Sequence, residues 1–215
     1  MSRALSLLLI SVCFACTNQP QQNRRGSAST HQNGADTAQD IVRTMLPELF
    51  EYFSQHDSSF ASSAFDAGAK TPLPDQAAEP VDKEFTKYHS LLMFNSDSSK
   101  AIDLYSYNFI FQKKDNRDVL TEAGPDMEIA LYDVNDRTRR RLLFTGPSVP
   151  LLDAKWISDK DILIGGAEEI NEDQIKPLLW QISLTDGSQQ LLVYRDTLKG
   201  NVRQYLSGKL KAKEF

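Results

Sequence analysis

Asp103, Tyr105 and Tyr107 are chemically useful side chains that occupy every second position of one apolar stretch. Successive side chains of a β-strand point to opposite faces of the sheet, so this spacing puts all three on one face. A carboxylate beside two phenols can hydrogen-bond to a sugar or a peptide, and we take these residues as the candidate binding site. A solvated sheet face with aromatic cross-strand packing explains the same pattern, and we favour this second interpretation.

Two further groups of acidic residues are candidates for a catalytic carboxylate pair. Glycoside hydrolysis uses two carboxylates at a defined separation, which sequence alone does not give. Acidic residues in a hairpin loop also serve solubility, or bind calcium through their oxygens. The first group is Asp126 and Glu128, and the second is Glu168, Glu169, Glu172 and Asp173. They leave a small hydrolase of glycan or peptide as an alternative function.

The densest basic run of the chain follows a predicted turn. Guanidinium groups pair with carboxylates and phosphates, so such a run suits an acidic partner or a lipid headgroup. Charged side chains on an edge strand also prevent sheets from aggregating edge to edge, and we favour this second interpretation. The run consists of Arg137, Arg139, Arg140 and Arg141.

The cysteines and histidines do not form the pattern of a metal site. Zinc ligands normally come in pairs at short spacing along a helix or hairpin. The three histidines, His31, His56 and His89, are far apart, and the two cysteines, Cys13 and Cys16, both lie in the N-terminal apolar segment. We therefore expect no metal and no cofactor.

The N-terminal segment predicts export. Arg3 precedes an uncharged apolar run from Ala4 to Ala15. As a helix this run would span ~18 Å, because each residue adds about 1.5 Å. The hydrocarbon core of a bilayer is ~30 Å thick. Residues 1–15 therefore predict a signal peptide rather than a transmembrane helix.

The end of this segment, Val12-Cys13-Phe14-Ala15-Cys16, resembles the lipobox of bacterial lipoproteins. The resemblance implies cleavage before Cys16 and lipidation of Cys16, with acyl chains that hold the protein at a membrane. Residues 16–36 are rich in Gln, Asn, Ser and Gly, which predicts a flexible tether. A soluble periplasmic protein, released by cleavage after Ala15, is the alternative.

Composition narrows the class of partner. The formal net charge is −5, with 40% hydrophobic and 25% charged residues, which is typical of a soluble globular protein. Proteins that bind nucleic acid usually carry a basic surplus, so we expect no nucleic acid. The expected partners are a membrane, through the lipid anchor, and an envelope protein or a surface polymer.

Three segments flank the predicted domain. Residues 37–56 carry apolar side chains at helical spacing and predict an amphipathic helix, which begins or kinks at Pro47. Residues 57–84 are dominated by Ser, Ala, Asp and Pro, which predicts a loop or linker. Residues 198–215 predict a short helix followed by a basic C-terminal tail.

Residues 85–197 predict a mainly β domain. Short runs of β-branched, leucine and aromatic residues, each closed by turn residues, indicate an antiparallel meander of about eight strands. The predicted strands are residues 90–94, 101–111, 127–134, 139–145, 154–157, 161–165, 178–184 and 189–194.

Two parts of this domain resemble each other. Phe94-Asn95-Ser96-Asp97 is similar to Trp156-Ile157-Ser158-Asp159, and each is followed by strands of similar order and spacing. Each unit resembles a β-propeller blade, but two units are too few to close a propeller. We therefore expect two blade-like sheets packed together, with one N-terminal amphipathic helix that covers an edge or a face.

The stretch from Tyr88 to Tyr194, and above all Phe94 to Asn108, resembles small uncharacterised bacterial envelope lipoproteins. This resemblance implies a shared fold, export and lipid anchoring, and it carries no activity. The sequence thus predicts an exported lipoprotein that serves as a non-enzymatic binding or structural module of the cell envelope.

Overall fold

The computed structural model describes residues 35–57, 60, 65–114 and 117–211. Cys16 and the predicted signal peptide, residues 1–15, lie outside the described residues, as does the predicted tether up to residue 34. Within the described part, no helix has the length and hydropathy that a membrane span requires.

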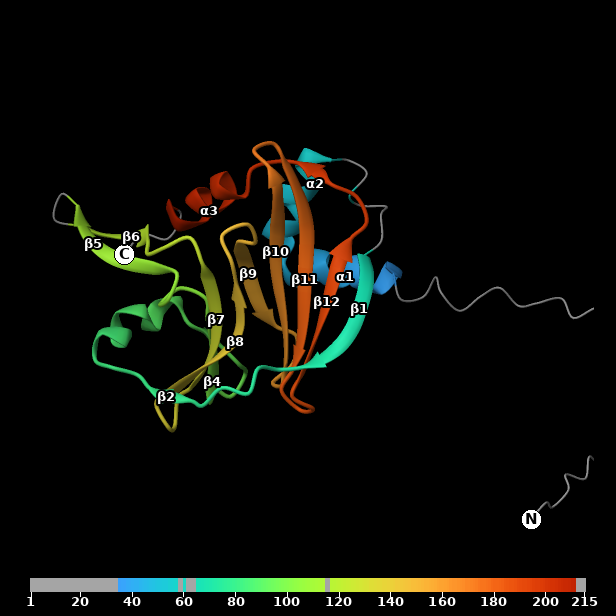
Figure 1. Ribbon diagram of the computed structural model, residues 1–215. Helices are drawn as coiled ribbons and strands as arrows, with labels where there is room; N and C mark the ends of the chain where they lie inside the picture. The colour runs from blue at the N-terminus through green and yellow to red at the C-terminus, as the bar shows by residue number, and fades with distance from the viewer. Residues whose placement is uncertain (1–34, 58–59, 61–64, 115–116, 212–215) are drawn as a thin grey trace, which may run out of the picture. The chain divides into compact units, whose positions relative to one another are not determined.

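Antiparallel strands dominate the described chain, as predicted (Figure 1). One six-stranded sheet, which we call sheet A, has the order β1-β12-β11-β10-β9, and its sixth strand, β13, pairs with β11. Its strands are β1 (Phe65–Pro72), β9 (Leu151–Trp156), β10 (Asp161–Asn171), β11 (Gln174–Ser183), β12 (Ser188–Tyr194) and β13 (Leu198–Lys199).

The second sheet, sheet B, is five-stranded and has the order β2-β8-β7-β4-β3. Its strands are β2 (Glu79–Pro80), β3 (Met93–Phe94), β4 (Lys100–Asp103), β7 (Met127–Asp133) and β8 (Thr138–Thr145). A separate hairpin of β5 (Phe109–Lys114) and β6 (Arg117–Glu122) lies between β4 and β7 in the chain.

Sheets A and B repeat the same strand order. In each sheet, four strands are neighbours in chain order: β9, β10, β11 and β12 in sheet A, and β3, β4, β7 and β8 in sheet B. One strand from earlier in the chain pairs with the last of the four, β1 with β12 and β2 with β8. We call this side of each sheet its outer edge. After β1, the amide of Leu73 donates to the carbonyl of Gly187 at 2.7 Å; after β2, the amide of Val81 donates to the carbonyl of Arg137 at 3.1 Å. Gly187 and Arg137 both have a positive φ, of 62° and 53°. β1 and β2 are therefore counterparts, as are β12 and β8.

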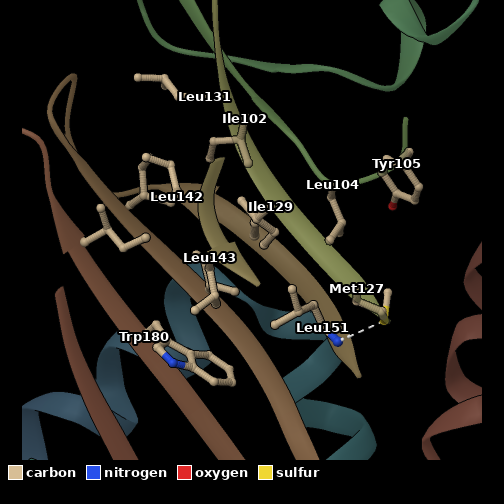
Figure 2. Close-up of a cluster of buried hydrophobic side chains, with 14 of the residues drawn as sticks. Ile102, Leu104, Tyr105, Met127, Ile129, Leu131, Leu142, Leu143, Leu151 and Trp180 are labelled. Carbon is tan, nitrogen blue, oxygen red and sulfur yellow. Dashed lines mark hydrogen bonds between the residues drawn. The ribbon is translucent and has the colours of Figure 1, made fainter. Parts of the chain in front are cut away.

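The two sheets share a hydrophobic core (Figure 2). Buried side chains of sheet B, including Ile129 and Leu143, belong to one cluster with Ile164 and Trp180 of sheet A. Full burial of an aliphatic side chain contributes ~1.5–3 kcal/mol relative to exposure. This cluster therefore holds the two sheets together.

The opposite faces of the two sheets are covered differently. The helices α1 (Ala35–Met45), α2 (Pro47–His56) and α3 (Val202–Lys211) contribute to a second core with sheet A, which includes Leu49, Phe53 and Leu206. On sheet B, the 3₁₀ helix η2 (Glu84–Leu91) supplies Phe85, whose ring lies 4.9 Å from that of Tyr132. Sheet B is thus covered by one short helix, whereas three helices pack on sheet A.

The N-terminal segment differs from the single helix that we expected. The structure has two helices there, α1 and α2, separated at Leu46, and Pro47 is the first residue of α2. Proline suits the first turn of a helix, because the N–H that it lacks would have no partner there.

Residues 57–84 are not simply the predicted loop or linker, because they hold β1 and β2. β1 lacks an alternating pattern, since Phe65 is buried and its other seven residues are exposed. Pairing with the backbone of β12 holds this strand in place instead. The short C-terminal helix that we expected is α3, which buries Val202 and Leu206; residues 212–215 of the predicted tail lie outside the described residues.

The predicted strand at residues 101–111 is wrong in its middle. β4 ends at Asp103 and β5 begins at Phe109. The Asp103 carboxylate accepts the backbone amides of Tyr105 and Ser106 at 3.1 and 2.9 Å, which forms a local turn in place of the strand. The prediction also omitted β6.

Candidate functional site

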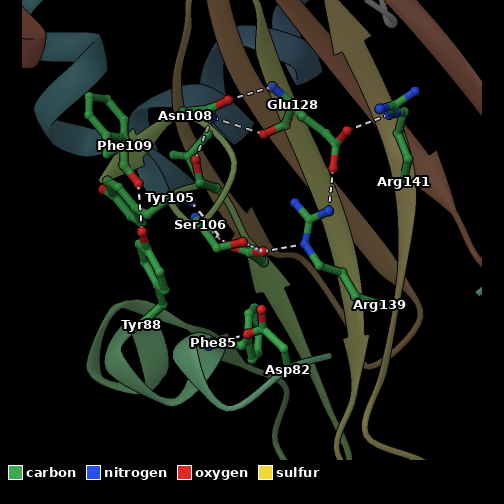
Figure 3. A network of polar contacts seen from close by, with 12 residues as sticks. Asp82, Phe85, Tyr88, Tyr105, Ser106, Asn108, Phe109, Glu128, Arg139 and Arg141 are labelled. Carbon is green, nitrogen blue, oxygen red and sulfur yellow. Dashed lines mark hydrogen bonds and ion pairs between the residues drawn. The ribbon is translucent and has the colours of Figure 1, made fainter. Parts of the chain in front are cut away.

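Asp103 lies at the centre of a buried charged cluster, which consists of Asp103, Glu128, Arg139 and Arg141. Arg139 donates from Nε to Asp103 Oδ2 at 2.6 Å and from Nη1 to Glu128 Oε1. Arg141 donates from Nε to Glu128 Oε2. Figure 3 shows Arg139 directed at Glu128, with Arg141 on the other side of that carboxylate. Both acids are 1% exposed.

Both carboxylates of this cluster have hydrogen-bond donors at each oxygen. Asp103 Oδ1 accepts two backbone amides, and Oδ2 accepts the Ser106 hydroxyl as well as Arg139. Each oxygen of Glu128 accepts one arginine. A general acid or base must exchange a proton with its substrate, so oxygens that arginine already occupies are poorly placed for that role. The cluster is suited to holding structure.

The electrostatics of Arg139 agree with this role. Burial by itself lowers the pKa of its guanidinium, but the charges and hydrogen bonds of Asp103 and Glu128 outweigh that effect and raise the pKa. Its Nη2 is buried with no hydrogen-bond partner among the described residues. Arg139 therefore stays charged, and two acids compensate its charge.

Asn108 connects the charged cluster to the turn that follows β4. Its amide nitrogen donates to the carbonyl oxygens of Leu104 and Glu128, the latter at 2.9 Å. Its amide oxygen accepts the backbone N–H of Glu128 at 2.7 Å. Asn108 is buried, so these bonds fix the turn of residues 104–108 against β7.

A pocket of about 350 Å³ lies against this turn and the charged cluster. The residues that line it are of four kinds: the acids Glu79, Asp82 and Glu84, the aromatic residues Phe85, Tyr88 and Tyr107, the polar residues Ser106 and Arg139, and the apolar residues Pro80 and Val81. All three carboxylates belong to exposed residues, whereas Phe85 is buried. The pocket thus combines an acidic rim with aromatic walls.

Local hydrogen bonds position the pocket walls. Asp82 Oδ1 accepts the amide of Phe85 at 3.0 Å at the start of η2. Tyr88 donates its hydroxyl to the carbonyl of Phe109 at 2.8 Å, which ties η2 to β5. Burial, and next the charge of Asp103, raise the pKa of the Tyr88 phenol. That phenol therefore remains a hydrogen-bond donor.

The structure separates the three residues that the alternation grouped together. Asp103 lies in the charged cluster, and Tyr107 lines the pocket with 40% of its surface exposed. Tyr105 is buried, and its ring lies 5.9 Å from that of Phe109. Burial, and next the charges of Asp153 and Glu48, raise the pKa of Tyr105. Whether Asp103 and Tyr107 serve a ligand remains a prediction.

The second acidic group is not among the residues that line this pocket. Glu172 and Asp173 lie in the turn between β10 and β11, and Glu169 is 3.8 Å from Arg203. Within the described residues, no group of three or more histidine, cysteine or acidic side chains could hold a metal ion. His56 contacts the Tyr52 carbonyl through Nδ1 at 2.8 Å, and His31 and Cys16 lie outside the described part.

The basic run also has a role that sequence reasoning did not assign. Arg139 and Arg141 neutralise buried acids, whereas we expected them to protect an edge or to bind a partner. The pocket residues of 79–88 were missed because residues 57–84 were taken as a loop and residues 85–88 as the start of the β domain. One available signal was Asp82, three residues before Phe85, which is the spacing of a side chain that caps a first turn.

Comparison with known proteins adds no assignment to this geometry. No protein-family model, curated protein or solved structure matches this chain.

Proposed function

We propose that this chain is an exported, lipid-anchored binding module of a cell envelope, without catalytic activity, whose pocket receives a basic side chain of a partner protein. The apolar leader and the lipobox-like residues before Cys16 support the address. The pocket, with its acidic rim and aromatic walls, supports the binding role and carries the proposal.

The chemistry of the pocket favours a cationic group. Exposed carboxylates attract an ammonium or guanidinium group, and aromatic faces add a cation–π attraction of ~0.5–1 kcal/mol at exposed sites. Arg139 would repel such a group, but Asp103 and Glu128 already compensate its charge. The rim acids Glu79 and Asp82 then determine the sign of the field.

The alternative function, a small hydrolase, has weaker support. It would need two carboxylates that are free to exchange protons with a substrate. Asp103 and Glu128 both approach the pocket wall, but arginine and backbone donors occupy their oxygens. A binding role requires no such free pair.

We also interpret sheets A and B as two copies of one blade-like unit. Their strand order, outer-edge strands and turn conformations support a duplication. In this interpretation the outer face of sheet B is the end of a two-unit stack. Here η2 covers part of the face that a further unit would cover in a longer stack, and the pocket lies beside η2.

The binding role is tested by titrating isotope-labelled protein with Nα-acetyl-arginine amide, followed by NMR. We expect the ring signals of Tyr88 and Tyr107 to shift and saturate. Glu79→Gln and Asp82→Asn should each weaken binding roughly two- to fivefold, because an exposed ion pair contributes ~0.2–1 kcal/mol. Glu172→Gln removes the same charge outside the pocket and should leave binding unchanged.

The acidic counterpart, Nα-acetyl-glutamate amide, serves as the control ligand. Equal responses to the two ligands, or no shift at either tyrosine with the arginine ligand, would contradict the proposed pocket function.

The address is tested separately in cells that are fed labelled palmitate. We expect label in the full-length protein and none in a Cys16→Ala variant, which should also move from the membrane fraction to the soluble fraction. If the wild-type protein carries no label and is found in the soluble envelope fraction, the proposed lipid anchor is wrong and the soluble periplasmic alternative is supported.

A further inference from the structure

The outer edges of the two sheets are covered to very different lengths. In sheet A, β1 pairs with β12 from Phe65 opposite Tyr194 to Pro72 opposite Ser188, with one register shift between Ala67 and Lys70. In sheet B, β2 pairs with two residues of β8, Thr138 and Arg139. Among the described residues, no strand pairs with residues 140–145 of β8 on that side.

β1 and β2 have similar C-terminal ends, so the two strands differ in the residues that precede these ends. Pro72 and Pro80 are each the last residue of their strand, and each pairs with the first residue of the outer strand. Upstream of its proline, β1 continues for seven more residues in the sheet, whereas β2 has one, Glu79. Sheet B therefore lacks most of the strand that its counterpart has.

Backbone groups of β8 are directed to this uncovered edge. In β12 the carbonyl of Leu191 faces β1, because a Cβ on Gly68 of β1 would lie 3.1 Å from that oxygen. Arg141 is the counterpart of Leu191 in the register of β8. The carbonyl of Arg137 points to the β2 side, and alternate residues present their backbone groups to the same edge. Arg141 thus offers an N–H and a carbonyl to a further strand.

The side chains along the uncovered edge suit an extended partner. Phe144 is 43% exposed, and its ring lies 6.0 Å from that of Tyr107 at the pocket. Arg140 has no ion pair among the described residues, so its charge is available to an acidic side chain. A second copy of this chain would offer its own residues 140–145, which include no acidic side chain to pair with Arg140.

We propose that an extended, acidic segment of a partner protein adds to β8 as a strand, antiparallel to residues 140–145, in the place that β1 fills on β12. Hydrogen bonds between the two backbones supply the affinity, and a carboxylate of the partner beside Arg140 supplies the preference for an acidic sequence. This surface is separate from the acidic pocket, so the inference goes beyond the proposed function.

The test is hydrogen exchange of the whole mature protein, measured residue by residue by NMR, with acetyl-Thr-Glu-Val-Glu-Val-Thr-amide. We expect saturating peptide to slow exchange of the Arg141 amide. Exchange at Val193 of β12 should stay unchanged, since that residue already pairs with Asp66 of β1. The matched control is the same peptide with all backbone nitrogens methylated, which keeps the side chains and removes the donors.

Three results would overturn this proposal. One is unchanged exchange at Arg141 with saturating peptide, and another is equal slowing by the methylated peptide, which would mean side-chain contact without strand addition. The third is slowing at Arg141 with protein concentration alone, accompanied by dimers in sedimentation, which would make a second copy the occupant. Shifts of Tyr88 and Tyr107 with the arginine ligand report on the pocket independently, so failure of one proposal leaves the other measurable.

Discussion

At the scale of single residues, sheet B carries charges where sheet A carries apolar side chains. By strand register, Glu128 corresponds to Leu178, and Arg141 corresponds to Leu191. Leu178 and Leu191 belong to the core that the two sheets share. In sheet B, the corresponding face is the outer one, which does not contact sheet A. Glu128 stays buried there only because two arginines neutralise it.

The charged cluster leads to a prediction for stability. Glu128→Gln removes one buried partner and leaves Arg139 and Arg141 without their shared acid, which should lower the free energy of unfolding by ~3 kcal/mol. Urea denaturation monitored by tryptophan fluorescence measures it. Glu172→Gln, at an exposed turn, should change stability by less than about 0.5 kcal/mol. Equal stability of the two variants would contradict the proposal that the charged cluster stabilises the fold.

Tyr105 leads to a prediction for alkaline pH. Burial raises its pKa in the folded protein above the ordinary value of 10.0, so the folded state favours the neutral phenol. The stability that follows is fully present below pH 10 and decreases as pH rises beyond it. Tyr105→Phe should therefore make the loss of stability above pH 10 less steep, as measured by urea denaturation at a series of pH values. An unchanged slope in Tyr105→Phe would contradict this effect of burial.

Sequence reasoning placed two of its three candidate binding residues near the pocket for a reason that was partly wrong. Alternation in a continuous strand grouped Asp103, Tyr105 and Tyr107, but the strand ends at Asp103. The turn that Asp103 caps directs Tyr105 into the core and Tyr107 to the surface. A side chain that bonds to its own backbone overrides alternation, and composition alone does not reveal when this happens.

At the scale of elements, β10 is packed tightly on both of its faces. A Cβ on Gly166 would lie 2.8 Å from the carbonyl oxygen of Pro150 and 2.9 Å from the Trp180 ring. Gly166→Ala should therefore lower the free energy of unfolding by ~1–3 kcal/mol, because the backbone cannot move aside without loss of pairing. Gly146→Ala is the matched control, since nothing lies within 4 Å of its Cβ position. Thermal unfolding of both variants measures the difference.

The two tryptophans connect the sheets in different ways. Trp180 is buried in the shared core, and Trp156 donates its indole N–H to the carbonyl of Met93 in sheet B at 2.7 Å. Trp180→Ala should lower the free energy of unfolding by ~3–5 kcal/mol, as a large cavity in a core does. Trp156→Ala should cost less, because that ring is partly exposed. Denaturant titrations that leave both variants near wild type would contradict the shared core.

Strands that bury side chains were predictable, and strands held by backbone pairing were not. β7, β8, β11 and β12 all match predicted runs, because leucine and β-branched residues alternate or cluster in them. β1 buries Phe65 alone, and β2 is two exposed residues, so neither has a pattern to detect. Pairing partners far along the chain decide such strands.

At the scale of the whole described domain, the repeat explains where the candidate site lies. Helices cover one face of sheet A, sheet B covers the other face, and a long strand, β1, pairs along the outer edge. Sheet B has sheet A on one face, η2 on part of the other, and a two-residue strand on its edge. The pocket and the uncovered edge therefore both belong to the less covered member of the pair.

The claim on which this account depends is that β8 lacks the cover that β12 has. Native-state hydrogen exchange of the free protein, compared at one amide of each outer strand, tests it most directly. We predict that the amide of Val193, which pairs with Asp66 of β1, exchanges slowly, and that the amide of Arg141 in β8 exchanges much faster under the same conditions. Equal protection of the two amides in dilute protein would mean that the edge of β8 is already covered, and would contradict the account.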